Sequence, residues 1–475
     1  MTENLTANIL DIVSGLPDNW LIGCDGGEFC RKVDRTFQQL TQNPPHTIFI
    51  AESEPIQFIA SFIAACAAKS HIFLCNPNWA KSEWEQVFDL VKPDIILGKV
   101  IELEQRFPFL TVREGGFRSC SSEFHSPKFL EINELPLIMI PTGGSSGKIR
   151  FAMHTWETLT ASVQGFQQYF ELDKINSFCV LPLYHVSGLM QFMRSITTGG
   201  KLAIQSFKEL EFGQIYDIKL EEFFISLVPT QLQRLLKNLD TANWLCRFPT
   251  VLLGGAPAWP ELLATARKYQ IKLALTYGMT ETASQIATLK PKDFIAGNNS
   301  CGQILPHAQV TIRSAKGEIL CYNQVGNIAV NAKSLALGYY PNKVANREYL
   351  QLDDLGFFDQ NNYLNIVGRN SDKIITGGEN VFPTEVEAAI RATNLVADVA
   401  VIGWPDKDWG QVVTAIYVAA NSEVTIKTLQ VAIEDKLSKF KRPKSWVVVE
   451  KLPRNAQGKV NREQLQEIAI EYQFL

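Results

Sequence analysis

Short apolar runs alternate with longer segments of helical spacing along most of the first 370 residues. Residues 46–51 and 72–74 are apolar runs of strand length, and the apolar segment 55–68 between them is long enough for a helix. Segment 82–91 has helical spacing and precedes another apolar run at 94–97. Because parallel strands are joined by crossover helices, this order predicts an α/β fold with a parallel sheet.

The same alternation recurs further along the chain and then changes its rhythm. Strand-length runs follow at 178–181, 201–204, 224–228, 250–253 and 272–275. Between about 300 and 368, short runs such as 309–312 and 326–330 alternate with turns instead of helices. This part predicts a small barrel or an antiparallel sheet appended to the parallel one.

A different unit begins after Gly368. It contains two helical segments and three strand-like runs, at 385–391, 426–437, 396–403, 412–419 and 446–450. Roughly 100 residues suffice for an independent domain. We therefore expect a smaller α+β domain after a large N-terminal one.

The composition is that of an ordinary globular protein. Of 475 residues, 46% are hydrophobic and 20% charged, which excludes a disordered or collagen-like chain. The length exceeds what one core organises, so two or three domains are expected. A formal charge of −4 gives no overall attraction to nucleic acid or to an anionic membrane. We expect no nucleic-acid partner.

The cysteines and the N-terminus indicate where the protein works. Nine cysteines, scattered from Cys24 to Cys321 without a C-x-x-C pair, argue against a disulfide framework and for a reducing compartment. The first residues lack the basic and apolar regions of a signal peptide. The most apolar stretch, 58–68, is shorter than the roughly 20 residues of a membrane span. We expect a cytoplasmic protein with no integral membrane segment.

A glycine- and serine-rich loop follows the apolar run 135–140. Residues 141–148 read Pro-Thr-Gly-Gly-Ser-Ser-Gly-Lys, which is typical of phosphate binding because glycines turn N–H groups inward and the lysine adds charge. The loop fails as a P-loop of the G-x-x-x-x-G-K-[ST] type, since Thr142 replaces the first glycine and Ile149 follows the lysine. Taken alone, it is explained equally well as a flexible surface turn.

Two further segments follow predicted strands, at the sheet edge where open α/β sheets bind ligands. The small residues of 253–257, Leu-Gly-Gly-Ala-Pro, allow a flat ring to approach the backbone, although a tight turn is the simpler explanation. Segment 276–281, Thr-Tyr-Gly-Met-Thr-Glu, combines a ring for stacking, a hydroxyl for phosphate and a carboxylate for magnesium. The same residues also fit the capped start of a helix.

Three other places carry side chains suited to catalysis. His185 follows the run 178–181, although a lone histidine in an apolar context is more often structural. The charged segment 368–373 lies between the two predicted domains, where such clusters are usually solvated. Lys459 ends a glycine-containing segment near the C-terminus that by itself indicates an exposed loop.

Taken in this order, the segments resemble the acyl-adenylate-forming superfamily of acyl-CoA synthetases, luciferases and peptide-synthetase adenylation domains. The resemblance runs from about residue 45 to 465. It implies an N-terminal domain over 1–368, built of two parallel-sheet subdomains plus a small β-barrel. It also implies a hinge at 369–372 and a mobile α+β lid over 373–475.

The resemblance assigns the nucleotide to three groups of residues. It matches the phosphate loop to Thr142, Gly143, Gly144, Ser145, Ser146, Gly147 and Lys148. It matches the adenine pocket to Gly255, Ala256, Pro257, Tyr277 and Gly278. It matches the ribose site to Asp354 and Arg369. The departures from the usual pattern are Gly143, Ser145, Ser146, Ile149 and Asp353, and of these Gly143 removes one hydroxyl donor.

The resemblance also implies a reaction in two halves. A carboxylate attacks the α-phosphate of Mg·ATP and gives acyl-AMP, and then the thiol of coenzyme A displaces AMP. The implied catalytic residues are Lys459, Thr280 and His185, and Glu281 is the implied magnesium ligand. A lid that turns about Asp372 then withdraws the lysine. Gly377 and Gly378 match the loop that admits the thiol.

Segment 181–195 narrows the choice of acid. Leu-Pro-Leu-Tyr-His-Val-Ser-Gly-Leu at 181–189, followed by Met-Arg-Ser, resembles the o-succinylbenzoate–CoA ligases of menaquinone and phylloquinone synthesis. Arg194 suits a second carboxylate because its fork pairs with that group bidentately, and Ser187 and His185 complete the implied acyl site. The predicted partners are therefore ATP, Mg²⁺, coenzyme A and a small dicarboxylic aromatic acid.

Two alternatives remain open at this point. An enzyme that loads an aryl or fatty acid onto a carrier protein fits the same motifs, because coenzyme A and carrier proteins present the same pantetheine thiol. A non-catalytic nucleotide sensor would lack the reactive lysine, and Lys459 is present.

Overall fold

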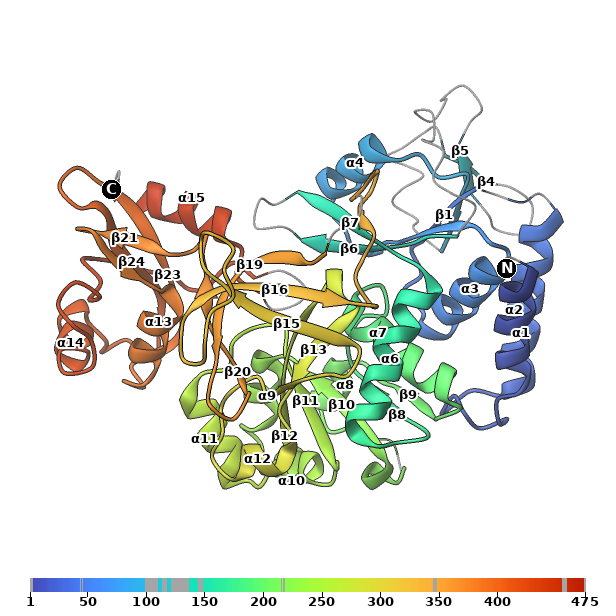
Figure 1. The fold of residues 1–475 in the computed structure, drawn as a ribbon, viewed down its shortest axis with the longest axis horizontal. Helices are drawn as coiled ribbons and strands as arrows, with labels where there is room; N and C mark the ends of the chain where they lie inside the picture. The colour runs from blue at the N-terminus through green and yellow to red at the C-terminus, as the bar shows by residue number, and fades with distance from the viewer. Residues whose placement is uncertain are drawn as a thin grey trace.

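The computed structural model describes residues 3–42, 44, 46–98, 110–112, 118–120, 136–143, 148–214, 216, 218–344, 348–454 and 459–473. Within them, two large sheets and their helices form the N-terminal region, a smaller sheet lies beside them, and a C-terminal domain forms one end of the molecule (Figure 1). The expected α/β class with a smaller C-terminal domain is confirmed.

The first large sheet has a parallel centre. Its described strands, in sheet order, are β18 (Asn342–Lys343), β17 (Gly338–Tyr339), β7 (Ile149–His154), β6 (Ile138–Gly143), β2 (His71–Leu74), β1 (Thr47–Ile50), β3 (Ile95–Leu97), β5 (Arg118–Cys120) and β4 (Leu110–Val112). Strand β1 pairs in parallel with β2 and β3, and β2 with β6. All four residues of β1 are buried, as expected for a parallel strand covered on both faces.

The second large sheet supplies the edge on which the site is built. Its described strands, in sheet order, are β14 (Gln303–Ile304), β13 (Ser284–Thr288), β12 (Leu273–Met279), β11 (Thr250–Leu253), β10 (Phe223–Leu227), β8 (Asn176–Cys179) and β9 (Leu202–Ile204). The strands from β9 to β12 run parallel, so their carboxyl ends lie at one edge.

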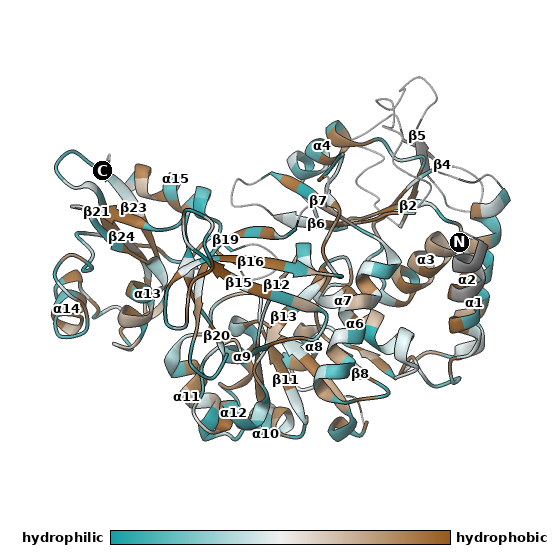
Figure 2. Cartoon of the chain, viewed as in Figure 1, coloured by the Kyte–Doolittle hydropathy of each residue, from teal (hydrophilic) through white to brown (hydrophobic). Residues whose placement is uncertain are grey.

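Helices cover and separate these two sheets. They are α1 (Glu3–Ser14), α2 (Gly26–Gln42), α3 (Pro55–Ala67), α4 (Lys81–Leu90), α6 (Trp156–Phe170), α7 (Val186–Thr198), α8 (Phe207–Glu211), α9 (Pro229–Leu235), α10 (Leu239–Cys246), α11 (Pro260–Lys268), α12 (Pro291–Ile295) and the 3₁₀ turns η1 (Leu220–Glu222) and η2 (Thr280–Thr282). Apolar residues of α3, α6 and α7 share one core with residues of both sheets, such as Ile50 and Leu252. Figure 2 shows α3 as a largely hydrophobic helix, and its start is fixed by the Glu54 carboxylate, which accepts the N–H groups of Ile56 and Gln57.

The smaller sheet confirms the change to antiparallel strands after residue 300. Its order is β15 (Ala308–Arg313), β16 (Gly326–Ala332), β19 (Leu350–Phe358) and β20 (Leu364–Arg369). One part of this region behaves differently from the sequence-based expectation. Strands β17 and β18 belong to the first large sheet and not to the small one. Tyr339 of β17 pairs there with Ala152 of β7, and β18 pairs with β17.

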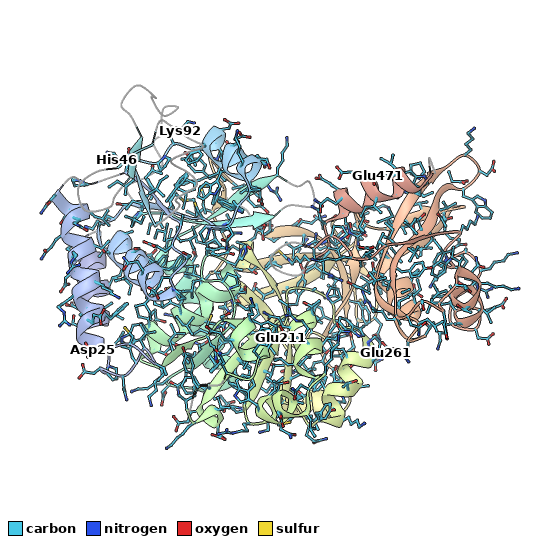
Figure 3. All side chains as sticks on the ribbon, turned by 180° about the vertical axis from the view of Figure 1, so that it is seen from behind. Asp25, His46, Lys92, Glu211, Glu261 and Glu471 are labelled. Atoms are coloured by element: carbon cyan, nitrogen blue, oxygen red, sulfur yellow. The ribbon has the colours of Figure 1, made fainter. Side chains whose placement is uncertain are left out.

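The C-terminal domain has its own apolar core. Its elements are β21 (Ile374–Thr376), β22 (Glu379–Val381), α13 (Pro383–Arg391), β23 (Val396–Asp406), β24 (Gly410–Ala419), α14 (Ile426–Ala432), β25 (Ser445–Val448) and α15 (Arg462–Gln473). Charged side chains such as Asp25 and Glu471 lie on the outside of the molecule (Figure 3). Within the described ranges, the helices are too short or too polar to span a bilayer.

Candidate active site

A cavity of about 450 Å³ lies at the carboxyl ends of the parallel strands of the second sheet, bordered by the small sheet and by Lys459 of the C-terminal domain. Open α/β sheets bind ligands at this edge. The predicted residues that line the cavity are Thr142, His185, Ser187, Arg194, Gly255, Gly278, Thr280, Glu281, Asp354, Arg369 and Lys459. A shallower hollow of about 510 Å³ beside residues 18–27 contains none of the predicted residues.

The phosphate loop is described only at its two ends. Thr142 lines the cavity and lies opposite Arg150 in the β6–β7 hairpin, and Gly143 pairs with Ile149. Lys148 is exposed and is not among the lining residues. The predicted Gly144, Ser145, Ser146 and Gly147 lie outside the described residues, so their roles stay predictions.

Thr280 and Glu281 are held by residues from distant segments. The carbonyl of Thr280 accepts a hydrogen bond from His154 Nε2 at 2.8 Å, and burial lowers the pKa of His154 to about 4, so the ring is neutral at pH 7. The Glu281 carbonyl accepts the N–H of Ala336 at 2.8 Å, and its carboxylate accepts the hydroxyl of Tyr339. A carboxylate so oriented in a cavity is a suitable oxygen ligand for Mg²⁺.

The predicted ribose site is a hydrogen-bonded group on adjacent strands. Asp354 accepts the hydroxyl of Tyr277 at 2.6 Å and lies 3.3 Å from Arg369 Nε. Tyr277 is not among the lining residues, so the structure places its hydroxyl behind the aspartate, and stacking on adenine stays a prediction. Burial and Asp354 raise the pKa of Tyr277, which therefore remains a hydrogen-bond donor.

The small residues that follow β11 pack closely against the end of β12. A Cβ on Gly254 would lie 2.2 Å from Thr276 Oγ1, and Gly255 has a φ of +82°, which favours glycine. Ala256 and Pro257 are not among the lining residues, so their predicted contact with adenine is untested.

The acyl end of the cavity contains one neutral and one charged group. Burial, and then Lys459, lower the pKa of His185 to about 3, so this histidine is uncharged at pH 7. Arg194 is 3% exposed, and one of its terminal nitrogens donates to Ser284 at 3.1 Å and to Gln285 at 2.7 Å. Its guanidinium lies 4.3 Å from the centroid of the Phe166 ring. No carboxylate of the described residues forms an ion pair with it.

Lys459 reaches this cavity from the segment before α15. Part of its side chain stays open to the solvent of the cavity. Burial by surrounding atoms, followed by the charge of Arg369, lowers the pKa of Lys459, and Glu281 and Asp354 partly oppose this effect. The ammonium group therefore interacts electrostatically with Glu281, the predicted metal ligand, and with Asp354, the predicted ribose ligand.

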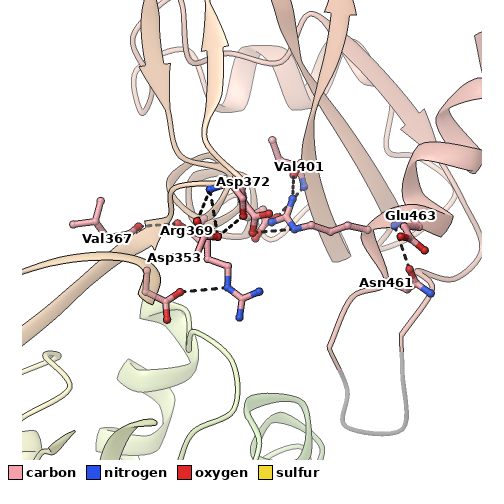
Figure 4. A network of polar contacts seen from close by, with 12 residues as sticks. Asp353, Val367, Arg369, Asp372, Val401, Asn461 and Glu463 are labelled. Atoms are coloured by element: carbon pink, nitrogen blue, oxygen red, sulfur yellow. Dashed lines mark hydrogen bonds and ion pairs between the residues drawn. The ribbon is translucent and has the colours of Figure 1, made fainter. Parts of the chain in front are cut away.

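Asp372 and the predicted thiol loop lie outside the cavity lining, whereas Arg369, the first residue of the predicted hinge, lines it. Asp372 Oδ2 lies 3.1 Å from Arg462 Nε, and Arg462 also donates to the carbonyl of Val401 at 3.3 Å, within the polar network of Figure 4. Burial raises the pKa of Asp372. Gly377 and Gly378 both have positive φ, at +58° and +85°, and form the turn between β21 and β22.

Two protein-family models match the chain. The first, described as AMP-binding enzyme, covers residues 27–340, and the second, described as AMP-binding enzyme C-terminal domain, covers residues 385–459. The chain belongs to the AMP-binding enzyme family.

Curated relatives are identical to this chain at about a third of the aligned positions. A 2-succinylbenzoate–CoA ligase of Listeria monocytogenes serovar 1/2a is 35% identical over 358 residues, 73% of each chain. The ligase of the same name from Enterococcus faecalis is 34% identical over 71% of this chain and 70% of its own.

Solved structures of AMP-binding enzymes have the same fold. ATP-bound MatB from Rhodopseudomonas palustris has a TM-score of 0.80 at 22% identity, covering 97% of this chain and 98% of that one. The o-succinylbenzoate CoA synthetase (MenE) of Bacillus subtilis, in complex with its acyl-adenylate intermediate OSB-AMP, has a TM-score of 0.77 at 24% identity, covering 96% and 97%. At these identities the likeness establishes the fold.

Several lining or supporting residues of this AMP-binding enzyme were missed from the sequence. Arg150 could have been found from its place two residues after Lys148. Gln285 belongs to the segment that follows Glu281 and could have been included with it. His154 and Tyr339 carry no local signal, because tertiary packing alone brings them to Thr280 and Glu281.

Proposed function

We propose that the protein is an ATP-dependent acid–CoA ligase that activates 2-succinylbenzoate as acyl-AMP and transfers the acyl group to coenzyme A. The observation that carries this proposal is one cavity lined by Glu281, Lys459 and a buried Arg194. The named activity of the curated relatives supports the same substrate. We place the reaction in menaquinone or phylloquinone synthesis, in the cytoplasm, with no nucleic-acid partner.

In the first half-reaction, a carboxylate oxygen of the acid forms a bond to the α-phosphorus of ATP. The bond between that phosphorus and the bridging oxygen breaks, and pyrophosphate leaves. Lys459 supplies positive charge where negative charge develops on the phosphoryl oxygens, and Thr280 supplies a hydroxyl near the same atoms. Mg²⁺ supplies charge neutralisation when bound, and Glu281 would hold it. His185 is neutral, so its role is to contact the acid without adding charge.

In the second half-reaction, the thiolate of coenzyme A attacks the acyl carbon and AMP leaves with the electrons of the broken C–O bond. We propose that residues 369–372 are the hinge and residues 373–475 the lid. Rotation about Asp372 would withdraw Lys459 from the cavity. The ion pair between Asp372 and Arg462 would then either break or move together with the lid. Gly377 and Gly378 would then line the thiol path.

The acid is selected at Arg194. A guanidinium buried without a carboxylate partner among the described residues is electrostatically unsatisfied, and an anionic group of the substrate would satisfy it. The carboxylate that becomes adenylated must face Lys459. The substrate therefore needs a second carboxylate, which 2-succinylbenzoate has and a fatty acid lacks.

The test is a pyrophosphate-release assay with 2-succinylbenzoate, benzoate and a fatty acid, followed by detection of the CoA thioester. Release with 2-succinylbenzoate alone supports the proposal. Release only with a fatty acid, or transfer only to a carrier protein, contradicts it.

Lys459→Ala separates the two half-reactions. Adenylation should fall by orders of magnitude, whereas thioester formation from supplied acyl-AMP should continue, because the lysine acts on the phosphoryl transfer only. Lys427→Ala, an exposed lysine of the same domain, is the matched control and should alter neither. Equal loss of both half-reactions would refute the role of Lys459.

A further inference from the structure

Tyr339 reaches the cavity from a strand that no nucleotide motif contains. Its strand β17 pairs with β7 at Ala152, directly beyond the phosphate loop, and Tyr339 lines the cavity. The tyrosine is therefore part of the same sheet as Thr142 and Arg150, although nearly 200 residues separate them in the sequence.

The segment that ends in Tyr339 contacts Glu281 at two points. The N–H of Ala336 donates to the main-chain carbonyl of Glu281 at 2.8 Å, and the Tyr339 hydroxyl donates to Oε1 of its carboxylate. One contact fixes the backbone and the other fixes the end of the side chain. Together they hold the otherwise flexible side chain of Glu281 in a single orientation.

The Tyr339 ring is held in turn by Arg150. The guanidinium carbon of Arg150 lies 4.2 Å from the ring centroid, and Arg150 also lines the cavity. A cation over a phenol ring attracts its π electrons and keeps the ring from rotating away. One face of the ring and the hydroxyl are thereby held by residues that line the cavity, Arg150 and Glu281.

We propose that Tyr339 is a positioning residue that orients the Glu281 carboxylate for Mg²⁺, an inference that rests on the proposed function. Glu281 lies close enough to Lys459 for their charges to interact. An ion pair between them would occupy both the metal ligand and the catalytic cation. The Tyr339 hydroxyl holds Oε1 of Glu281, so the second carboxylate oxygen would be left to bind the metal. Partners of this kind typically change metal affinity about 10–100-fold.

The test compares ATP binding with Mg²⁺ and with a chelator, measured by calorimetry, in wild type and Tyr339→Phe. Phenylalanine keeps the ring under Arg150 and removes only the hydroxyl. We expect metal-free ATP affinity to change less than twofold, whereas the gain in affinity on adding Mg²⁺ should fall at least tenfold. Tyr322→Phe, which removes a 2.9 Å hydrogen bond to Asn362 on the exposed surface, should leave that gain unchanged.

A double-mutant cycle shows whether Tyr339 acts through Glu281. In a Glu281→Gln background, Tyr339→Phe should have no further effect on the Mg²⁺-dependent gain. An undiminished gain in Tyr339→Phe, or an equal further loss in the Glu281→Gln background, would overturn the inference. If wild type shows no Mg²⁺-dependent gain, the proposed function itself fails, which is a separate outcome.

Discussion

Replacing Arg194 by methionine should stabilise the free protein and destroy its preference for a dicarboxylic acid. Burial lowers the pKa of Arg194 from 12.5 to about 9. Since each pKa unit corresponds to about 1.4 kcal/mol, this lowering gives an upper limit of about 5 kcal/mol for the cost of burying the charge. Part of that cost is offset by the hydrogen bonds to Ser284 and Gln285 and by the contact with Phe166. We expect a net gain of about 1–3 kcal/mol in Arg194→Met.

The pH dependence of this stability follows from the direction of the shift. The folded state binds the proton of Arg194 less tightly than the unfolded state does. The destabilisation is therefore fully present at every pH below about 9 and fades only as the pH rises from there towards 12.5. The increase in melting temperature of Arg194→Met should accordingly be constant between pH 6 and pH 8.

Catalysis should change in the opposite direction. Removing one partner of a buried charge pair costs about 2–5 kcal/mol, so kcat/KM for 2-succinylbenzoate should fall about 30-fold to several-thousand-fold. For benzoate, which has no second carboxylate, kcat/KM should change less than about threefold.

Arg234→Met provides the matched control for both measurements. Arg234 also lies over a phenylalanine, Phe207, but it is exposed and ion-paired with Glu211. It should alter neither stability nor selectivity by a comparable amount. An equal loss of kcat/KM for both acids in Arg194→Met, or a lower melting temperature, would refute the assignment of Arg194 to the substrate.

Three further results are expected. Because burial and Arg369 lower the pKa of Lys459, kcat/KM for adenylation should decline at a pH below the ordinary lysine value of 10.5, and Lys459→Arg should move this limb upward. Tyr277→Phe removes the hydrogen bond to Asp354 and should raise KM for ATP about tenfold, with KM for the acid unchanged in steady-state assays. Gly377→Ala forces a side chain into positive φ, 2.7 Å from the Trp409 ring, and should destabilise the protein by about 1–2 kcal/mol in thermal melts.

The sequence predicts well those features that depend on neighbours along the chain. The buried strands β1, β10 and β11 follow from apolar runs, and helix α3 follows from a longer one, because strand and helix lengths differ. The predicted Thr280 and Glu281 reach the cavity because they directly follow a parallel strand, whose carboxyl end has a fixed place in such a sheet.

Features that depend on distant contacts could not be predicted in this way. Residues 338–343 lie in the stretch that was expected to form a small barrel or antiparallel sheet, yet β17 pairs with β7 and β18 pairs with β17, since two-residue strands carry too little pattern to specify a partner. The stacking of Tyr277 on a base stays a prediction, and the sequence did not predict that its hydroxyl donates to Asp354. The alternation of residues along β12 predicts on which face of the sheet the side chain of Tyr277 lies. It does not predict which residue accepts the hydrogen bond of its hydroxyl.

The two cations of the cavity, Arg194 and Lys459, differ in how the surrounding residues compensate their charge. This difference fits a reaction in two steps. Arg194 is buried in a helix of the N-terminal core, and no described carboxylate compensates it. Lys459 belongs to the C-terminal domain and shares the cavity with Glu281 and Asp354, which favour its charged form. If residues 373–475 move as the proposed lid, Lys459 moves with them while Glu281 and Asp354 stay in the N-terminal region. Under the proposed function, Arg194 stays in the core when the lid moves, so it would keep the second carboxylate of the acid bound while the thiol enters.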